Sequence, residues 1–207
     1  GKPFIDYRFV PGPFMRGLSR ALLHPEENVV VLIEELNRGN AAAILGDVLQ
    51  LLDRGDDGRS RYEIEATPEQ RAYFAAQGIT SDVVSLPPNF YLWATMNSAD
   101  QGVFPLDTAF RRRWSYVYKG YTEPCAYPSD VAVISYGGKR YSWDAFRGPI
   151  NDHLVEQGIH EDKLVGPYFL AALQLSDQQA VLQKLFLYLW DDVLRFRQEA
   201  LLSDRSF

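Results

Sequence analysis

The sequence predicts an α/β fold, with a parallel sheet at the core of residues 1–120 and a mainly helical unit over residues 121–207. Two apolar runs, 29–33 and 90–96, are rich in β-branched and aromatic residues, and each ends abruptly in polar residues, as buried strands of a parallel sheet do. Segments with a helical apolar period lie between and after these runs. From Gly120 onward a hairpin pattern is followed by helical patterns alone, which indicates a second structural unit.

The first unit is expected to alternate helices and strands. A helix over 13–24 precedes the run 29–33, which lacks polar alternation and is therefore predicted to be buried on both faces of the sheet. Asn40 is a suitable N-cap for a helix over 41–54, whose apolar positions recur at helical spacing, and Gly55 follows as a stop.

Five further elements are predicted in this unit. Residues 59–65 are expected to form a β-hairpin arm, residues 68–77 a helix, and residues 83–86 a short extended piece. Beyond the second apolar run we expect a helix over 105–113, begun by a proline, and a third strand over 114–118.

The second unit is predicted to begin with a hairpin over 131–143, because Gly137 and Gly138 can supply the positive φ angles of a tight turn. The segments that follow have helical spacing, and the predicted helices cover 144–157, 167–174 and 177–202.

Composition is that of an ordinary soluble globular protein, with 46% apolar and 23% charged residues. No apolar run is long enough to span a membrane, and the N-terminus lacks the pattern of a secretory signal. The lone Cys125 excludes an internal disulfide and fits a cytoplasmic location. The net charge of −6 argues against a protein coated in positive charge for nucleic acid.

Two carboxylates, Glu34 and Glu35, directly follow the first apolar run. In open α/β sheets, ligands bind beyond the carboxyl ends of the strands. One acid there can hold Mg²⁺ with its waters, while the other polarises an attacking water. This is the layout of a Walker B element, and the alternative is a strand that runs into a solvated loop.

Polar residues also follow the second run, where Asn97 stands, and an arginine cluster, Arg111, Arg112 and Arg113, ends the next predicted helix. If the strands are parallel neighbours, Asn97 shares a sheet edge with the acids and can bind both the attacking water and a phosphate oxygen. The arginines can neutralise charge on a transferring phosphoryl group across a subunit boundary. The alternatives are a turn residue for Asn97, and for the arginines helix C-terminal charges, an internal pair or a DNA-facing patch.

Three segments resemble the McrB-type AAA+ motor, the NTPase subunit of modification-dependent restriction systems. They are Glu-Glu-Leu-Asn-Arg-Gly-Asn at 34–40, Met-Asn-Ser-Ala-Asp-Gln at 96–101 and Leu-Asp-Thr-Ala-Phe-Arg-Arg-Arg-Trp at 106–114. Residues 163–169 resemble a segment of the helical lid of that group, and the similarity covers most of 7–202. The resemblance implies an AAA+ P-loop NTPase-like core with a C-terminal helical lid.

The resemblance also implies roles for individual residues. Glu34 would be the Walker B acid that supports Mg²⁺ through water, and Glu35 would activate the attacking water. Asn97 would be sensor 1 and Asp100 would belong to the signature loop of the group, and both would contact the nucleotide.

The resemblance also implies roles for the arginines, and two positions differ from the pattern of the family. Arg112 and Arg113 would be finger or sensor arginines at a subunit interface, and Arg111 would lie beside the nucleotide. Glu34 replaces the more usual Asp, so the metal would be held through one extra methylene. Gln101 stands where the best-known member of the group has Arg, so a charge contact from that position is in doubt.

No G-x-x-x-x-G-K-[ST] phosphate-binding loop occurs in the 207 residues, since Gly1-Lys2 is followed by Pro3. Such a loop supplies the backbone N–H groups and the lysine that hold the phosphates. Without it we expect this chain to bind nucleotide poorly and to expose a sheet edge. Three explanations stay open: a piece of a longer protein, half of a split gene, or a degenerate motor kept for assembly.

The sequence therefore predicts part of a homo-oligomeric ring that hydrolyses GTP or ATP with Mg²⁺ and either drives DNA translocation or activates a partner nuclease. A membrane partner is not expected. One alternative is a non-catalytic assembly module that does not bind nucleotide by itself. Another is a DNA-binding domain that acts without hydrolysis, to which the net charge of −6 gives little support.

Overall fold

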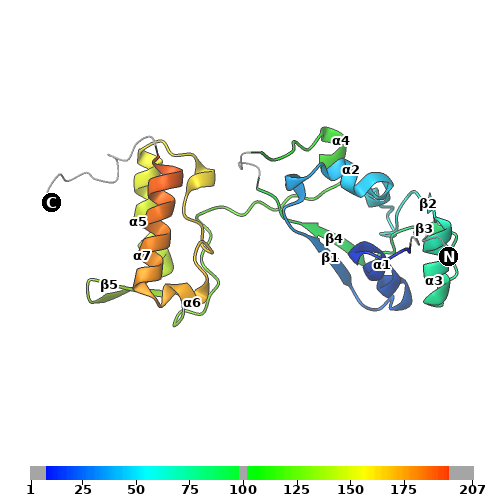
Figure 1. The fold of residues 1–207 in the computed structure, drawn as a ribbon, viewed down its shortest axis with the longest axis horizontal. Helices are drawn as coiled ribbons and strands as arrows, with labels where there is room; N and C mark the ends of the chain where they lie inside the picture. Colours follow the sequence, from blue (N-terminus) through cyan, green and yellow to red (C-terminus); the bar gives the residue numbers. More distant parts are fainter. Residues whose placement is uncertain (1–7, 98–101, 196–207) are drawn as a thin grey trace, which may run out of the picture. The chain divides into compact units, whose positions relative to one another are not determined.

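The computed structural model describes residues 8–97 and 102–195. The chain divides into two compact units, Gly1–Tyr116 and Val117–Phe207, whereas the sequence pattern predicts a division after residue 120. The elements of the first unit are α1 (Pro13–Leu23), β1 (Val29–Ile33), the 3-10 helix η1 (Leu36–Arg38), α2 (Ala41–Leu45), the 3-10 helix η2 (Gly46–Leu52), β2 (Ile64–Glu65), α3 (Pro68–Ala76), β3 (Val83–Val84), β4 (Phe90–Ala94) and α4 (Thr108–Arg111) (Figure 1).

Two parallel strands form the centre of the first unit. β1 and β4 pair in register from Val29 opposite Phe90 to Ile33 opposite Ala94. This pairing confirms that the two apolar runs of the sequence are parallel neighbours, although a long stretch of chain separates them. β4 ends at Ala94, two residues before the predicted end of the strand.

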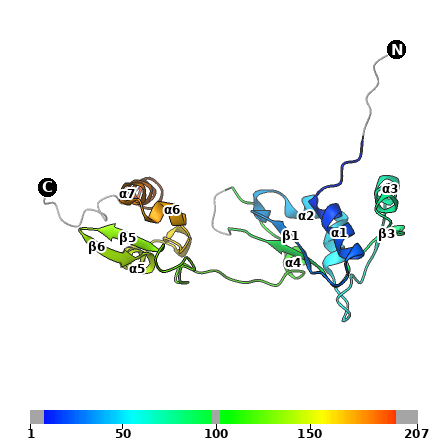
Figure 2. The ribbon, with the colours of Figure 1, turned by 90° about the horizontal axis from the view of Figure 1, so that it is seen from below.

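One face of this strand pair is covered by α1, which lies along β1 and β4 in both views (Figures 1 and 2). Gly17 allows the helix to approach closely, because a Cβ atom at this position would come within 2.8 Å of Val31 Cγ2 and 3.2 Å of the Phe90 ring. The buried side chains at this contact are Met15, Leu18, Ala21, Val29 and Phe90.

The opposite face of the pair is apolar and open within the described residues. Val30, Leu32, Tyr91 and Trp93 alternate with the buried positions and are 44%, 55%, 43% and 63% exposed. The prediction that residues 29–33 are buried on both faces is therefore wrong for this structure. The described helices that pack on the pair do so on the α1 face, so nothing described shields the other one.

The predicted helix over 41–54 begins as expected and then breaks. The Asn40 side chain accepts a hydrogen bond from the Ala43 N–H at 3.1 Å, so the N-cap is confirmed. Gly46 has a φ of +50° and ends α2, and the chain continues as the tighter helix η2. A glycine in the middle of a helical pattern weakens the helix, and here it permits the break.

Three other local predictions differ from the structure. Residues 59–65 do not form a hairpin arm, because β2 pairs antiparallel with β3, with Ile64 opposite Val84. The helix expected over 105–113 is shortened to α4, since the Asp107 side chain caps the Phe110 N–H and starts the helix later. The expected strand over 114–118 is not a strand. The helix expected over 68–77 is confirmed as α3.

The second unit consists of β5 (Val133–Tyr136), β6 (Lys139–Ser142), α5 (Trp143–Glu156), the 3-10 helix η3 (Glu161–Lys163), α6 (Ala172–Leu175), α7 (Gln178–Leu187) and the π-helix η4 (Tyr188–Val193). The predicted hairpin is confirmed as β5–β6, and its two turn glycines, Gly137 and Gly138, have φ angles of +57° and +75°. The helix predicted over 177–202 is α-helical only as α7 before it widens into η4, and its last part lies outside the described residues.

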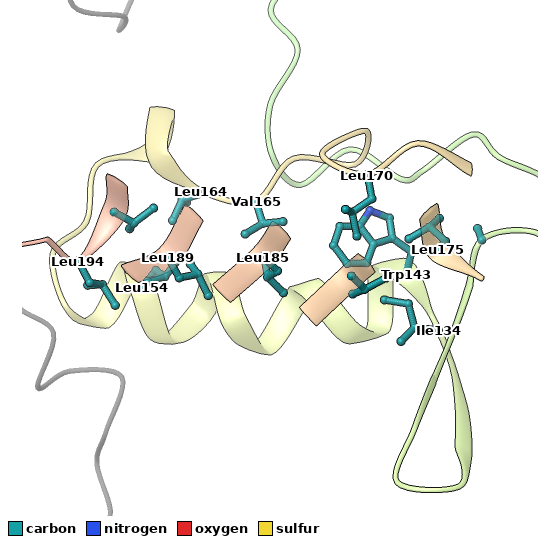
Figure 3. Close-up of a cluster of buried hydrophobic side chains, with 13 residues drawn as sticks. Ile134, Trp143, Leu154, Leu164, Val165, Leu170, Leu175, Leu185, Leu189 and Leu194 are labelled. Atoms are coloured by element: carbon teal, nitrogen blue, oxygen red, sulfur yellow. The ribbon is translucent and has the colours of Figure 1, made fainter. Parts of the chain in front are cut away.

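Apolar side chains from β5, α5, α6, α7, η4 and the segment 164–170 form the core of this unit (Figure 3). Trp143 is fully buried at the start of α5, and its indole N–H donates to the Pro167 carbonyl at 2.9 Å. Leu154 of α5 and Leu185 and Leu189 of the α7–η4 segment continue the same cluster. None of the described helices is long and apolar enough to cross a lipid bilayer.

Candidate functional site

The two predicted acids lie at the carboxyl end of β1. Glu34 and Glu35 are both exposed, and the chain turns sharply between them and η1. Glu35 has a φ of +52° and a ψ of +48°, a left-handed conformation that is uncommon for a residue other than glycine. Such a conformation persists only when neighbouring contacts impose it, and it is often found at functional sites.

The contacts that impose this turn come from the end of β4. The Glu35 N–H donates to Thr95 Oγ1 at 3.1 Å, and the Leu36 N–H donates to the Thr95 carbonyl at 2.9 Å. The Thr95 N–H in turn donates to the Ile33 carbonyl at 2.9 Å. The ends of the two strands are therefore joined side by side, past the point where the strands themselves stop.

A third connection reaches Asn97. The side-chain amide of Asn37 donates to the Asn97 carbonyl at 2.7 Å, and the Asn37 carbonyl accepts from the Phe104 N–H at 2.8 Å. Asn97 is exposed, whereas Asn37 is only 4% exposed. Glu35 and Asn97 thus lie at the same end of the strand pair, as we expect if the two apolar runs form neighbouring parallel strands.

Glu35 also pairs with a residue of its own turn. Arg38 Nε lies 3.2 Å from Glu35 Oε2, with the two side chains 49% and 69% exposed. An exposed pair of this kind contributes little to stability. It brings the Glu35 carboxylate next to Arg38 at the end of η1.

The acids fit the chemistry of a magnesium site. Glu34 and Glu35 offer exposed carboxylate oxygens, the hard ligands that Mg²⁺ prefers, with room for the water molecules that this ion retains. The residues present therefore suit an ion held through water.

The arginine cluster divides into two kinds of residue. Arg111 and Arg112 are exposed at the end of α4. Arg113 instead pairs within the chain: its Nε and Nη2 atoms lie 3.0 and 2.9 Å from Asp53 Oδ2, and its Nη1 atom donates to the Ala109 carbonyl at 2.8 Å. The internal pair that the sequence left open as an alternative is therefore found at Arg113.

α4 is anchored beside the acidic turn. Phe110 is 1% exposed and belongs to the same buried cluster as Leu36 and Ala41. Leu36 directly follows Glu35, so the element that carries Arg111 and Arg112 packs against the turn that carries the acids.

Three residues of this site were missed by the sequence analysis: Asn37, Arg38 and Thr95. A signal was present for the first two, because both belong to the segment 34–40 that carries the resemblance. No signal in the sequence pointed to Thr95, since threonine is a common residue in strands. The predicted site residue Asp100 lies outside the described residues.

Comparison with known proteins gives a family and two relatives. Residues 5–114 match the AAA domain family of the dynein-related subfamily, so the match contains β1, β4 and both of their polar ends. Over 199 residues the chain is 45% identical to the type II restriction enzyme BsuMI component YdiS of Bacillus subtilis (strain 168), which covers 94% of this chain and 57% of that protein.

A second relative is more distant. The chain is 28% identical over 116 residues to the type IV methyl-directed restriction enzyme EcoKMcrB subunit of Escherichia coli (strain K12), covering 55% of this chain and 23% of that protein. The chain thus spans little more than half the length of the Bacillus relative and about a quarter of the Escherichia one. On the strength of the family match and these similarities, the chain belongs to the dynein-related AAA domain family and is a McrB-type AAA+ protein.

Proposed function

We propose that this chain is part of an AAA+ NTPase motor in a McrB-like restriction system. The observation that carries the proposal is the in-register parallel pairing of β1 and β4, which sets Glu34, Glu35 and Asn97 at one end of the sheet. The names of both relatives support a restriction system, since each is a component of a restriction enzyme.

The acids and the amide have distinct roles in this proposal. Glu35 accepts a proton from the attacking water as the water oxygen bonds to the terminal phosphorus and the bond to the departing nucleoside diphosphate breaks. Glu34 would hold Mg²⁺ through water. Asn97 orients the attacking water and a terminal phosphate oxygen. When bound, Mg²⁺ neutralises the charge of the phosphate oxygens of GTP or ATP.

The exposed arginines support a ring of identical subunits. Arg112 and Arg111 leave α4 toward solvent, so their guanidinium groups are available to a nucleotide held by a neighbouring subunit. The finger role was predicted for both Arg112 and Arg113; the ion pair with Asp53 favours a structural role for Arg113, so we propose Arg112 as the finger. Asp100 keeps its proposed place in the signature loop.

The output of hydrolysis is proposed to be mechanical. Hydrolysis would drive DNA translocation or activate a partner nuclease in the cytoplasm, with residues 121–207 as the helical lid of the motor.

The test is nucleotide turnover. Mg²⁺-dependent hydrolysis of GTP and of ATP is measured for the full-length gene product and for the 207-residue chain. Replacing Glu35→Gln should lower kcat of the full-length product by about 100-fold or more, because the base is lost while its shape is kept. The control Glu63→Gln removes an exposed carboxylate just before β2, which is not part of the β1–β4 pair, and should leave kcat unchanged. Turnover that survives Glu35→Gln would refute the role of this residue.

The second candidate function is a non-catalytic assembly module. It is favoured by one observation: Arg111 and Arg112 are exposed and could serve contacts between subunits without hydrolysis. A full-length product that assembles into rings but hydrolyses neither nucleotide would support it. A third candidate, DNA binding without hydrolysis, would be supported by Arg112→Ala abolishing DNA binding while turnover stays intact.

A further inference from the structure

We infer that Asn37 is a positioning residue for hydrolysis, which holds the segment carrying Asn97 in place against the turn carrying Glu35. The inference rests on the proposed function, in which Glu35 and Asn97 act on the same water molecule.

The hydrogen bonds of Asn37 join three parts of the chain. Its side chain donates to the Asn97 carbonyl at 2.7 Å, and its carbonyl accepts from the Phe104 N–H at 2.8 Å. In the sequence, Asn97 precedes and Phe104 follows residues 98–101, where the signature loop is predicted, so Asn37 contacts one residue before and one residue after that range. Through Leu36 and Glu35 it is continuous with the acidic turn.

Asn37 itself is rigidly supported. It is 4% exposed and lies in η1, directly after Leu36, which is 5% exposed and packs in one cluster with Phe110 and Ala41. The Leu36 N–H is bonded to the Thr95 carbonyl at 2.9 Å. A side chain held in this way can position another group, because its own rotamer is fixed by packing.

An amide suits this place for a chemical reason. The Asn97 carbonyl is an acceptor, and the Asn37 amide donates to it from a side chain of the right length. An ionised aspartate has the same shape but no proton to donate, and it would direct a charged acceptor at the carbonyl. Alanine would leave the carbonyl without this partner.

The functional consequence follows from the geometry of the reaction. A reacting group displaced by about 1 Å can lower the rate by about 100-fold. Loss of the Asn37 bond removes one contact that positions the Asn97 backbone and leaves the Asn97 side chain in place. The rate should therefore fall only while that side chain is present to be misplaced.

A double-mutant cycle in the full-length gene product tests this. Wild type, Asn37→Ala, Asn97→Ala and the double variant are compared by kcat and KM for GTP and ATP. We expect Asn37→Ala alone to lower kcat about 10- to 100-fold with little change in KM. In the Asn97→Ala background the same change should lower kcat less than about threefold, because both substitutions remove one function.

Asn89→Ala is the matched control. Asn89 is also buried, at 7% exposure, and its amide donates to the carbonyls of Ala21, His24 and Glu27 at 3.0, 3.0 and 2.8 Å. It precedes β4, at the other end of the strand from Asn97. Its replacement should lower the unfolding temperature but leave kcat within about twofold of wild type at a temperature where the variant is folded.

Asn37→Asp separates hydrogen-bond donation from packing, since it keeps the volume of the side chain, and it replaces Asn37→Ala where that variant does not fold. It should lower kcat as Asn37→Ala does. Wild-type kcat in Asn37→Asp, or an equal loss from Asn37→Ala in both backgrounds, would overturn the inference while the proposed function stands. A wild-type product that hydrolyses neither nucleotide would overturn both.

Discussion

Replacement of Arg113 by methionine separates a structural arginine from a catalytic one. The guanidinium group of Arg113 makes two contacts with Asp53 Oδ2, at 3.0 and 2.9 Å, and a third with the Ala109 carbonyl at 2.8 Å. Methionine keeps much of the apolar stem and removes the charge and the donors, so the change reports on the pair rather than on packing.

The expected loss of stability comes from the burial of the pair. The Arg113 and Asp53 side chains are 13% and 29% exposed, so the Asp53 carboxylate would keep only part of its hydration after its partner is removed. Hydrogen bonds to charged groups contribute about 1.5–3 kcal/mol each, and solvent reduces this here, so Arg113→Met should cost about 2 kcal/mol. For a unit of this size that is about 8 °C in Tm.

The assay is thermal and urea unfolding of the full-length gene product, beside its nucleotide turnover. The exposed neighbour Arg112 provides the control, because Arg112→Met should change stability by less than about 0.5 kcal/mol. A cycle with Asp53→Asn should give a coupling free energy of about 1 kcal/mol or more between Arg113 and Asp53.

Turnover decides the role of each arginine. At a temperature where all variants are folded, Arg113→Met should retain most of the wild-type kcat, whereas Arg112→Met should lose about 1,000-fold if its guanidinium acts on the nucleotide of a neighbouring subunit. The reasoning would be refuted if Arg113→Met unfolds at the wild-type temperature and yet loses as much turnover as Arg112→Met.

Three further results are expected. Leu32→Lys together with Trp93→Lys should reduce self-association of the 207-residue chain in sedimentation, because both side chains lie on the open apolar face at 55% and 63% exposure; a wild-type chain that is already monomeric would contradict this. Trp143→Ala should lower the free energy of unfolding of the second unit by about 3–5 kcal/mol in urea, since Trp143 is fully buried, and a loss below about 1 kcal/mol would contradict that core. The pKa of Glu69 lies below its ordinary value of 4.5, because the carboxylate accepts hydrogen bonds from the Glu69 backbone N–H and from the Thr67 hydroxyl. The stabilisation that these bonds provide is complete above the unfolded-state pKa of Glu69 and is lost as pH falls through the folded-state pKa. An NMR titration midpoint of Glu69 at or above 4.5 would contradict this.

Local signals in the sequence were sufficient where the structure depends on near neighbours. The capping of α2 by Asn40 and the turn of Gly137 and Gly138 each involve residues only a few positions apart, so their residue types reveal them. The runs that became β1 and β4 were identified because strand-forming residues and abrupt polar ends coincide.

Non-local pairings were predicted less well. β2 pairs with β3, which lies about 20 residues further along the chain, and not with residues of the segment 59–65. The prediction of a hairpin arm over 59–65 is wrong because the sequence of a short strand does not indicate which strand it pairs with. The break of the 41–54 helix at Gly46 likewise depends on how η2 packs, which a helical apolar period does not record.

The candidate site shows the same division. The sequence by itself was enough to select the acids, the amide and the arginines as candidate site residues, because their order along the chain and their positions relative to the two apolar runs can be read from the sequence. Only the tertiary structure decided that Arg113 pairs with Asp53, that Asn37 binds the Asn97 carbonyl, and that one face of the strand pair stays open. Each of these depends on contacts between residues about 60 positions apart or on which face a helix covers, and the free energy that selects them arises only when the chain is folded.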